Sequence, residues 1–239
     1  ISANYLIWVH LCTFLEPGYA MNVRIDEKVK EILPNLQLGI IEANVVVSPS
    51  DDELWGMIDS VYKHLQETLT LEDVLKIESI QAARRSYKKL GKDPSRYRVS
   101  SDSLIRRIPK GMVLYKVNNI VDINNLISLE TGHSLGCVDL AKVKGDVVFT
   151  KGNAGDYYEG IGRGQINLEN MPVFKDDEGY FASTTSDSVR TQVTEESKHI
   201  MMMVICFEGD SKLNEYIEKI NSLMTKYADA NILEAKIVE

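Results

Sequence analysis

The strongest constraint on the fold is an almost uninterrupted apolar run, His-Ile-Met-Met-Met-Val-Ile-Cys-Phe, from His199 to Phe207. A strand with one face in water alternates apolar and polar residues, so a continuous run of this length predicts a strand buried on both faces. Apolar residues then recur at helical spacing from Leu213 to Met224, which predicts an amphipathic helix. The stretch 231–238 predicts a last strand. This β-α-β order favours a parallel pair of strands near the C-terminal end.

The rest of the chain mixes strand and helix patterns. β-branched residues predict a strand over 36–47, and Ser48-Pro49 begins a predicted helix. Strand-and-turn patterns dominate from 135 to 181. The chain has no repeats or low-complexity linkers, so we expect one α+β domain over 21–239, with a mixed sheet, flanking helices and a helical lobe at about 50–110.

Residues 1–20 differ in character from the rest of the chain. Tyr5 to Leu15 is apolar, but no basic segment precedes it and no Ala-x-Ala-like cleavage site comes after it, which argues against a secretory signal. We interpret residues 1–20 as an N-terminal extension ahead of Met21; the alternative is an element that docks its apolar side on the fold. The three cysteines are scattered and histidine is scarce, which disfavours a disulfide framework or a zinc site. With no apolar stretch near ~20 residues, we expect no membrane association and a cytoplasmic protein.

The charge distribution is uneven. The net charge is −8, yet residues 84–110 hold ten basic and two acidic side chains, so this window is +8 and the remainder is −16. A local basic patch on an acidic body suits one selected anionic ligand, because the body repels polyanions elsewhere. The alternative is a solvated charged face.

Inside this window, Arg96-Tyr97-Arg98 places an aromatic ring between two arginines. Such a ring can stack on a base while the guanidinium groups hold phosphates. The alternative is that Tyr97 packs under the loop and the arginines pair with the acidic body. The candidates for contact with an RNA backbone are Arg84, Lys88, Arg96, Tyr97, Arg98 and Arg107.

A second polar segment runs from Asn118 to Asn125. Asp122 and Asn125 are three residues apart and therefore share one face of the predicted helix. Asn118 and Asn119 lie at its start, where backbone N–H groups can receive an anion or a carbonyl. Capping plus a polar rim is the structural alternative. The chain has no Gly-x-Ser-x-Gly, His-Glu-x-x-His or Walker motif, and Gly160-Ile-Gly-Arg-Gly164 is interpreted as a turn.

These segments carry a resemblance. Ile120 to Gly132, followed by Leu135-Gly-Cys-Val-Asp139, resembles the Val-Asp-x-x-Asn helix and the following turn of the editing domain of the bacterial phenylalanyl-tRNA synthetase beta subunit. Arg106-Arg107 ahead of the helix and 194–200 after it match as well. The segments 91–98 and 185–191 are similar to those of a stand-alone branch of the family. The resemblance spans roughly residues 80 to 208.

The resemblance implies a mixed sheet and helices around a central cleft, which in the synthetase hydrolyses tyrosine wrongly attached to the tRNA for phenylalanine. This chemistry uses no metal, cofactor or covalent nucleophile, because positioning of water carries the effect. The implied partner is tRNA or aminoacyl-tRNA. The implied pocket residues are Asn118, Asn119, Asp122, Asn125, Thr185, Ser186, Asp187 and Arg190.

Two departures from the family pattern leave the catalytic residues unassigned. The editing histidine of the synthetase aligns here with Gly136, and its glutamate has no clear match in 183–190. Thr185, Ser186 and Asp187 are the candidates to replace these polar functions, and Arg190 would meet a phosphate or carboxylate. Three functions therefore remain open: hydrolysis of mischarged tRNA in trans, binding of tRNA without catalysis, and binding of a small amino-acid-like ligand in the same cleft.

Overall fold

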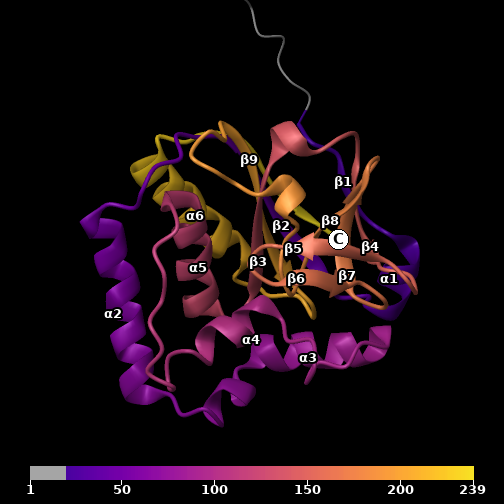
Figure 1. Ribbon diagram of the computed structural model, residues 1–239, viewed down its shortest axis with the longest axis horizontal. Coiled ribbons are helices and arrows are strands. Elements are labelled where there is room, and N and C mark those ends of the chain that lie inside the picture. Colours follow the sequence, from indigo (N-terminus) through magenta and orange to yellow (C-terminus); the bar gives the residue numbers. More distant parts are fainter. Residues whose placement is uncertain (1–19) are drawn as a thin grey trace, which may run out of the picture.

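The computed structural model describes residues 20–239 and shows the predicted α+β fold, in which two four-stranded sheets and a two-stranded hairpin are combined with helices (Figure 1). Residues 1–19, which make up all but the last residue of the predicted N-terminal extension, lie outside the described residues. Among the helices of 20–239, none has both the length and the apolar character needed to cross a bilayer.

The apolar run identified in the sequence forms the middle of the first sheet. It is buried on both faces, as predicted: Met201, Met203 and Ile205 pack on one side, while Met202 and Val204 pack on the other. This sheet has the order β10-β2-β9-β3 and consists of β10 (Asn231–Val238), β2 (Gln37–Asn44), β9 (His199–Cys206) and β3 (Ser134–Asp139).

The predicted β-α-β unit is present, but its two strands are not neighbours. Both β9 and β10 pair antiparallel with β2, so they run parallel to each other with β2 between them. The helix α6 (Leu213–Ala228) connects them. The β-α-β order predicts that β9 and β10 run parallel. It does not predict that β2, which comes from a distant segment of the chain, lies between them.

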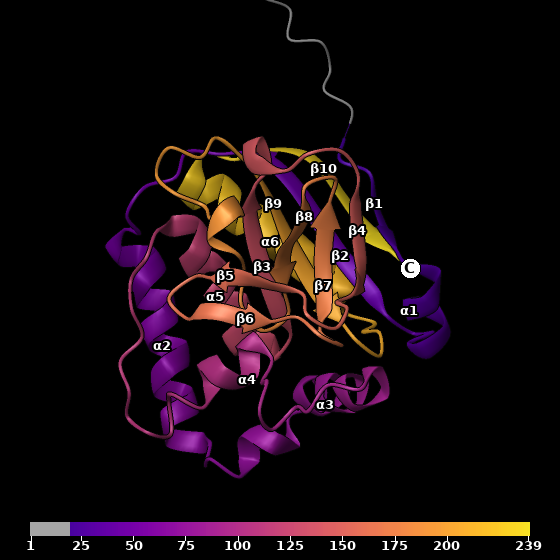
Figure 2. The ribbon, with the colours of Figure 1, turned by 45° about the vertical axis from the view of Figure 1, so that its right-hand side comes forward.

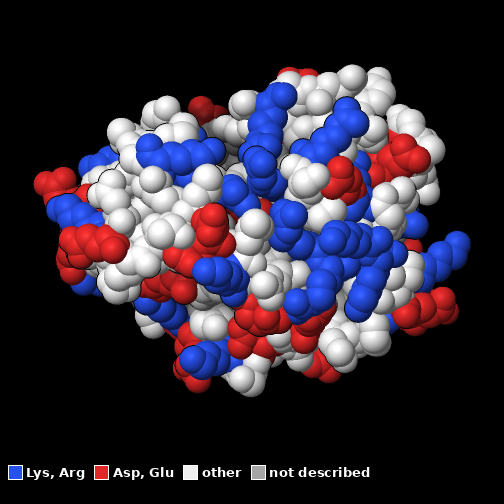
Figure 3. All heavy atoms as spheres, turned by 90° about the horizontal axis from the view of Figure 1, so that it is seen from below, with Lys and Arg blue, Asp and Glu red and all other residues white. Residues whose placement is uncertain are grey.

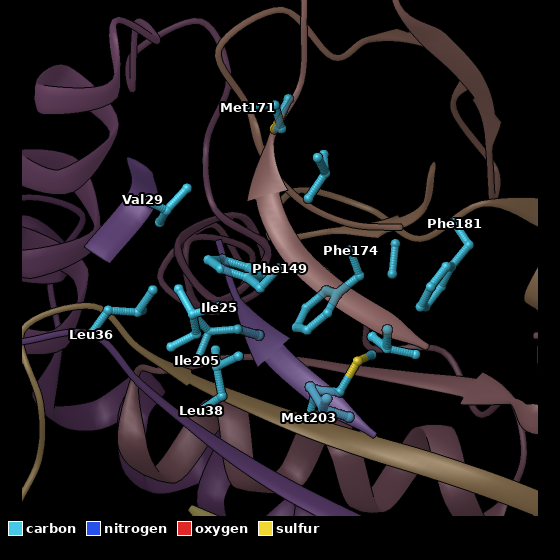
Figure 4. Close-up of a cluster of buried hydrophobic side chains, with 14 of the residues drawn as sticks. Ile25, Val29, Leu36, Leu38, Phe149, Met171, Phe174, Phe181, Met203 and Ile205 are labelled. Atoms are coloured by element: carbon cyan, nitrogen blue, oxygen red, sulfur yellow. The ribbon is translucent and has the colours of Figure 1, made fainter. Parts of the chain in front are cut away.

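A second sheet packs on the face that carries Met203. The side chains of Phe149, Phe174 and Phe181 fill the space between the sheets together with Leu38 (Figure 4). Its order is β1-β4-β7-β8, formed by β1 (Val23–Ile25), β4 (Val147–Lys151), β7 (Pro172–Asp176) and β8 (Gly179–Ser183). Two further strands, β5 (Tyr157–Gly160) and β6 (Gly164–Asn167), form a separate hairpin.

Helices cover the opposite face of the first sheet and one end of the molecule (Figure 1). On this face lie α5 (Asn119–Thr131) and α6, and α2 (Asp52–Thr68) packs against α5 on the side away from the sheet. At the end shown at the bottom of Figure 1 lie α3 (Glu78–Leu90) and α4 (Ser100–Ile105). The short elements are α1 (Glu27–Ile32), η1 (Asp73–Lys76), η2 (Leu140–Lys142) and η3 (Val189–Thr191).

Helix ends follow local side-chain chemistry. The helix expected from Ser48 begins at Asp52 instead, because the Asp51 side chain accepts from the Leu54 amide at 2.8 Å and so caps the first turn. Asn118 caps α5 by accepting from the Val121 amide at 2.9 Å. This cap fixes where α5 starts, and with it which residues of α5 face the neighbouring loops.

Candidate ligand-binding site

Three adjoining cavities lie where α4, α5 and β3 meet the loop that follows β8. The middle one, called here the central cavity, has a volume of about 320 Å³. Arg163, in the turn of the β5–β6 hairpin, lines all three cavities, and Figure 2 shows this hairpin reaching across the front of α5. The polar side chains of the central cavity are mostly hydroxyls and amides: Ser100, Ser103, Asn124, Asn125, Ser128 and Thr185.

One polar atom of the central cavity has no partner. Asn124 is only 8% exposed, and its Oδ1 makes no hydrogen bond within the described structure. Its Nδ2 reaches Asn125 Oδ1 at 3.5 Å, at the limit of a hydrogen bond. Buried polar atoms almost always have partners, so an enclosed oxygen without one is unusual. Rotation of the Asn124 side chain would turn this oxygen toward a ligand in the cavity.

The floor of the central cavity is held by a buried tyrosine. The Tyr87 hydroxyl, on α3, lies 2.5 Å from Thr184 Oγ1 and 3.0 Å from Thr185 Oγ1. Burial raises the pKa of Tyr87 to about 12, so it remains a neutral hydrogen-bonding group. This contact fixes the Thr185 side chain, which lines both the central cavity and the next one.

That next cavity, called here the basic cavity, has a volume of about 330 Å³ and carries Arg96, Tyr97 and Arg98. It shares Ser103, Thr185 and Arg163 with the central cavity, so the two are continuous. Figure 3 views the end formed by α3 and α4 and shows several groups of Lys and Arg side chains there, with acidic side chains between them.

The arginines beside these cavities have no carboxylate partner. Within residues 20–239 no ion pair involves the rim residues, which we define as Arg96, Arg98, Arg107 and Arg163. Arg107 donates instead to the Val113 carbonyl at 2.9 Å. The rim is therefore a set of positive charges without ion-pair partners around a hollow whose other polar groups are hydroxyls and amides.

A family model, the B3/4 domain, matches residues 82–235, which is more than half of the chain. The chain belongs to the B3/4 domain family. This family occurs in the beta subunit of phenylalanyl-tRNA synthetase, so the resemblance inferred from the sequence is confirmed. The matched range contains the residues of the central cavity, the basic cavity and the rim.

Among solved structures, the chain is similar to an N-terminal fragment of the phenylalanyl-tRNA synthetase beta subunit from Pyrococcus horikoshii, with 14% identity and a TM-score of 0.45. The match covers 91% of this chain and 50% of the fragment, so the chain spans about half the length of that structure. A search of curated proteins gives no match.

The B3/4 domain brings together part of the expected RNA-contacting set. Arg96, Tyr97, Arg98 and Arg107 all line the cavities. Arg84 does not, because its guanidinium donates to the Pro94 carbonyl at 3.1 Å and pairs with the buried Asp102. The exposed Lys88 also lies away from them, on α3.

Tyr97 itself is not a free stacking surface. Lys92 Nζ lies 3.8 Å from the centre of its ring, and the ring packs in part against the core between the sheets. Lys92 is in turn fixed by the carbonyls of Asn167 and Glu169, at 3.0 and 2.7 Å. Tyr97 therefore packs under its own loop, which is the structural alternative given in the sequence analysis.

The two asparagines at the start of α5 do not reach the central cavity. The side chain of Asn118 caps the helix, and Asn119 Nδ2 donates to the carbonyls of Val46 and Tyr227, both at 2.9 Å. Asn119 Oδ1 accepts from the backbone amide of Ser48 at 3.1 Å. These side chains connect α5 to distant segments of the chain.

Among the other expected pocket residues, Asn125, Thr185 and Ser186 line the central cavity. Asp122 lies one helical turn away and lines the third cavity, where burial raises the pKa of its carboxyl. Arg190 is not in the site, because it forms a bidentate ion pair with Asp176 at 2.9 and 3.1 Å, beside the turn between β7 and β8.

Asp187 lies behind the cavity wall, against β3. A Cβ atom at Gly136 would be 3.2 Å from Asp187 Oδ2 and 3.0 Å from the Met203 methyl group, so a larger side chain there would displace the carboxyl. The residue as a whole is partly exposed, but its carboxyl end is enclosed, and this burial raises its pKa to about 7 against the opposing effect of the Cys137 and Ser183 amides. The Asp187 carboxyl thus occupies the space beside Gly136.

Sequence reasoning missed two central contributors. Arg163 was part of a segment interpreted only as a turn, although a cation flanked by glycines at a hairpin tip was a usable signal. Asn124 adjoins Asn125, but nothing local shows that both side chains face one hollow. Within the described residues, no three His, Cys, Asp or Glu side chains gather as a metal site needs.

Proposed function

We propose that this B3/4 domain binds the aminoacylated 3′ end of a tRNA, with the esterified amino acid in the central cavity and the phosphates along the rim. The observation that carries this proposal is a hollow lined mostly by hydroxyl and amide groups that adjoins four arginines, none of which forms an ion pair within residues 20–239. A tRNA end has the matching distribution, because a polyanion terminates in a small ester with a free ammonium group.

The dimensions and chemistry of the central cavity support an amino acid as its occupant. Its volume of about 320 Å³ falls in the range of small-ligand sites. Rotation of the Asn124 side chain would present its Oδ1 to the ammonium group or to a side-chain hydroxyl of the ligand. Discrimination by such a group is strong, since a ligand that cannot donate leaves a buried acceptor unpaired.

The charge of the whole chain supports local rather than general RNA binding. The net charge is −8 although the rim is cationic. Contacts with phosphates make affinity salt-dependent in proportion to their number. We therefore expect a modest salt dependence, set by the few arginines of the rim.

The lining of the central cavity favours binding and positioning over acid–base chemistry. Its charged side chains, Arg107 and Arg163, are both cationic, and residues 20–239 contribute no carboxylate or imidazole to it. Hydrolysis of the ester is the second candidate function, favoured by the hydroxyls of Ser100, Ser103 and Thr185, which can place a water molecule. In that case positioning supplies the rate acceleration.

The test measures binding and ester cleavage in the same samples. Tyrosyl-tRNA for phenylalanine is titrated with the protein at several salt concentrations, and release of tyrosine is followed. We expect Arg163→Glu to weaken binding about tenfold or more and to reduce the salt dependence. The matched control is Lys88→Glu, which makes the same charge change on α3, outside the rim.

Three outcomes are decisive. Equal losses for Arg163→Glu and Lys88→Glu would show binding by overall charge and would contradict the proposed site. No salt-dependent binding by the unmodified protein would contradict the function. Release of tyrosine above the rate in buffer would select the hydrolytic candidate.

A further inference from the structure

The third cavity, called here the aromatic cavity, has a volume of about 380 Å³ and lies between α2, the hairpin turn and the segment that precedes α5. That segment runs beside α2 before the chain enters α5 (Figures 1 and 2). The cavity is lined by Trp55, Leu114, Tyr115 and Val117. It shares Leu104, Arg107, Asn125 and Arg163 with the central cavity, so the two are continuous.

The segment beside the aromatic cavity exposes apolar side chains to an unusual degree. Val113 and Tyr115 are each 71% exposed, and Met112 and Val117 are exposed as well. Four exposed apolar side chains within six positions are a concentration that, in proteins, indicates a site of interaction. Their proximity to the central cavity suggests a ligand that extends out of that cavity.

Cations accompany these rings. The Arg107 guanidinium lies 5.2 Å from the centre of the Tyr115 ring, and Lys116 Nζ lies 5.1 Å from that of Trp55. Asp122 is the carboxylate of the cavity lining, and its oxygens are already engaged by Ser50 Oγ at 2.5 Å and the Val117 amide at 3.1 Å. The surface therefore combines aromatic faces with positive charge.

We propose that the aromatic cavity holds an unpaired base at the 3′ end of the same RNA, stacked on Tyr115, with the adjoining phosphate between Arg107 and Arg163. The inference rests on the proposed function, because this base belongs to the nucleotide whose ester is placed in the central cavity. Aromatic stacking next to guanidinium groups is how proteins bind single-stranded nucleic acid. An apolar protein surface would cover these side chains but would leave the cations uncompensated.

Tyr115 is better suited to stacking than Tyr97, the only other tyrosine that lines the three cavities of the described structure. Lys92 covers one face of Tyr97 and the core contacts its ring. The Tyr115 ring is mostly in solvent. Tyr115 thus has a ring face free to receive a base, while Tyr97 supports the loop that presents Arg96 and Arg98.

The experiment uses a short single-stranded RNA that ends in the sequence CCA, with 2-aminopurine in place of the terminal adenine. Stacking quenches the fluorescence of 2-aminopurine, and anisotropy of a dye at the 5′ end reports binding independently. We expect binding with quenching for the unmodified protein. Tyr115→Ala should weaken binding roughly tenfold and remove the quenching, while Tyr115→Trp should retain both.

The matched control is Tyr157→Ala, which removes a tyrosine that is 63% exposed on β5 and does not line the cavities. We expect binding and quenching like those of the unmodified protein. Tyr115→Leu keeps apolar area without an aromatic face, so it should lose the quenching. Because both Tyr115 and Tyr157 are exposed, neither alanine substitution should unfold the protein, so a loss of quenching reports on stacking.

The results separate failure of this inference from failure of the proposed function. If the unmodified protein binds neither this RNA nor aminoacyl-tRNA, the proposed function fails and the inference falls with it. If it binds both, but without quenching and with the same affinity after Tyr115→Ala, only the inference is overturned. It is also overturned if Tyr115→Ala alters self-association in sedimentation and leaves RNA affinity unchanged, because the surface is then a protein contact.

Discussion

Helix α5 and the residue that caps it contain two pairs of asparagines with different roles. At its start, the side chains of Asn118 and Asn119 are engaged by the protein itself, Asn119 through contacts with Val46, Ser48 and Tyr227. Further along, Asn124 and Asn125 line the central cavity, and Asn124 Oδ1 has no hydrogen-bond partner among residues 20–239. The comparison teaches that an asparagine in the sequence predicts only a polar side chain. The face of the helix on which it lies decides whether this side chain stabilises the fold or can bind a ligand.

The largest effect is expected at the start of the helix. Asn119→Ala should lower the free energy of unfolding by about 3 kcal/mol, because it leaves the Val46 and Tyr227 carbonyls and the Ser48 amide without their partner. Urea denaturation measures this loss, with the exposed Asn35→Ala as a control that should change little. A stability loss at Asn119 no larger than that of the control would break the distinction between the two pairs.

Asp187 extends the comparison to a group buried behind the cavity. Its pKa is about 7 in the folded protein and 3.8 in an unfolded chain, so the folded state holds the proton more tightly. The unfolded state loses its proton first as pH rises, and the resulting destabilisation is absent below about pH 4 and complete above about pH 7. The stability advantage of Asp187→Asn over the unmodified protein, measured as free energy of unfolding, should therefore grow by about 2 kcal/mol as the pH rises from 5 to 8.

Urea denaturation at pH 5 and pH 8 measures this difference. Asp177→Asn is the matched control, because it makes the same change at an exposed carboxyl beside β7 and should leave the pH dependence as it is. If Asp187→Asn shows the same pH dependence as the unmodified protein, the Asp187 carboxyl is hydrated rather than enclosed against Gly136.

A smaller effect, of the opposite kind to that at Asn119, is expected at Asn124. Asn124→Leu keeps the approximate shape of the side chain and removes an oxygen that has no partner, so stability should stay the same or rise slightly. Affinity for tyrosyl-tRNA should fall about tenfold, or ~1.4 kcal/mol, because the acceptor for the ligand is gone. A large loss of stability with unchanged affinity would place Asn124 with Asn119 instead.

The fold was predictable where the signal is local. The two-sided burial of β9 followed from its composition, and the cap at Asn118 followed from a side chain three residues from its partner. The insertion of β2 between β9 and β10 was not predictable, because strand order depends on pairing between distant segments. The family was identifiable because its motifs, such as 120–132, are also local.

The site was predictable only in part, for the same reason. Asn125, Thr185 and Ser186 reach the central cavity as expected. Asn119 and Arg190 do not, because their partners, such as Tyr227 and Asp176, come from other parts of the chain and no spacing reveals them. A polar side chain is free for a ligand only if no distant group has already engaged it.

The turn of the β5–β6 hairpin has a consequence for how the site can change. Gly162 and Gly164 flank Arg163 with φ values of 67° and 69°, a backbone conformation that favours glycine, and the arginine between them borders every cavity of the site. Lengthening this turn by one residue would shift a single guanidinium away from the proposed positions of the amino acid, the phosphates and the base at once. Preferences for the amino acid and for the nucleic acid are therefore expected to drift together in relatives that differ in the length of this turn.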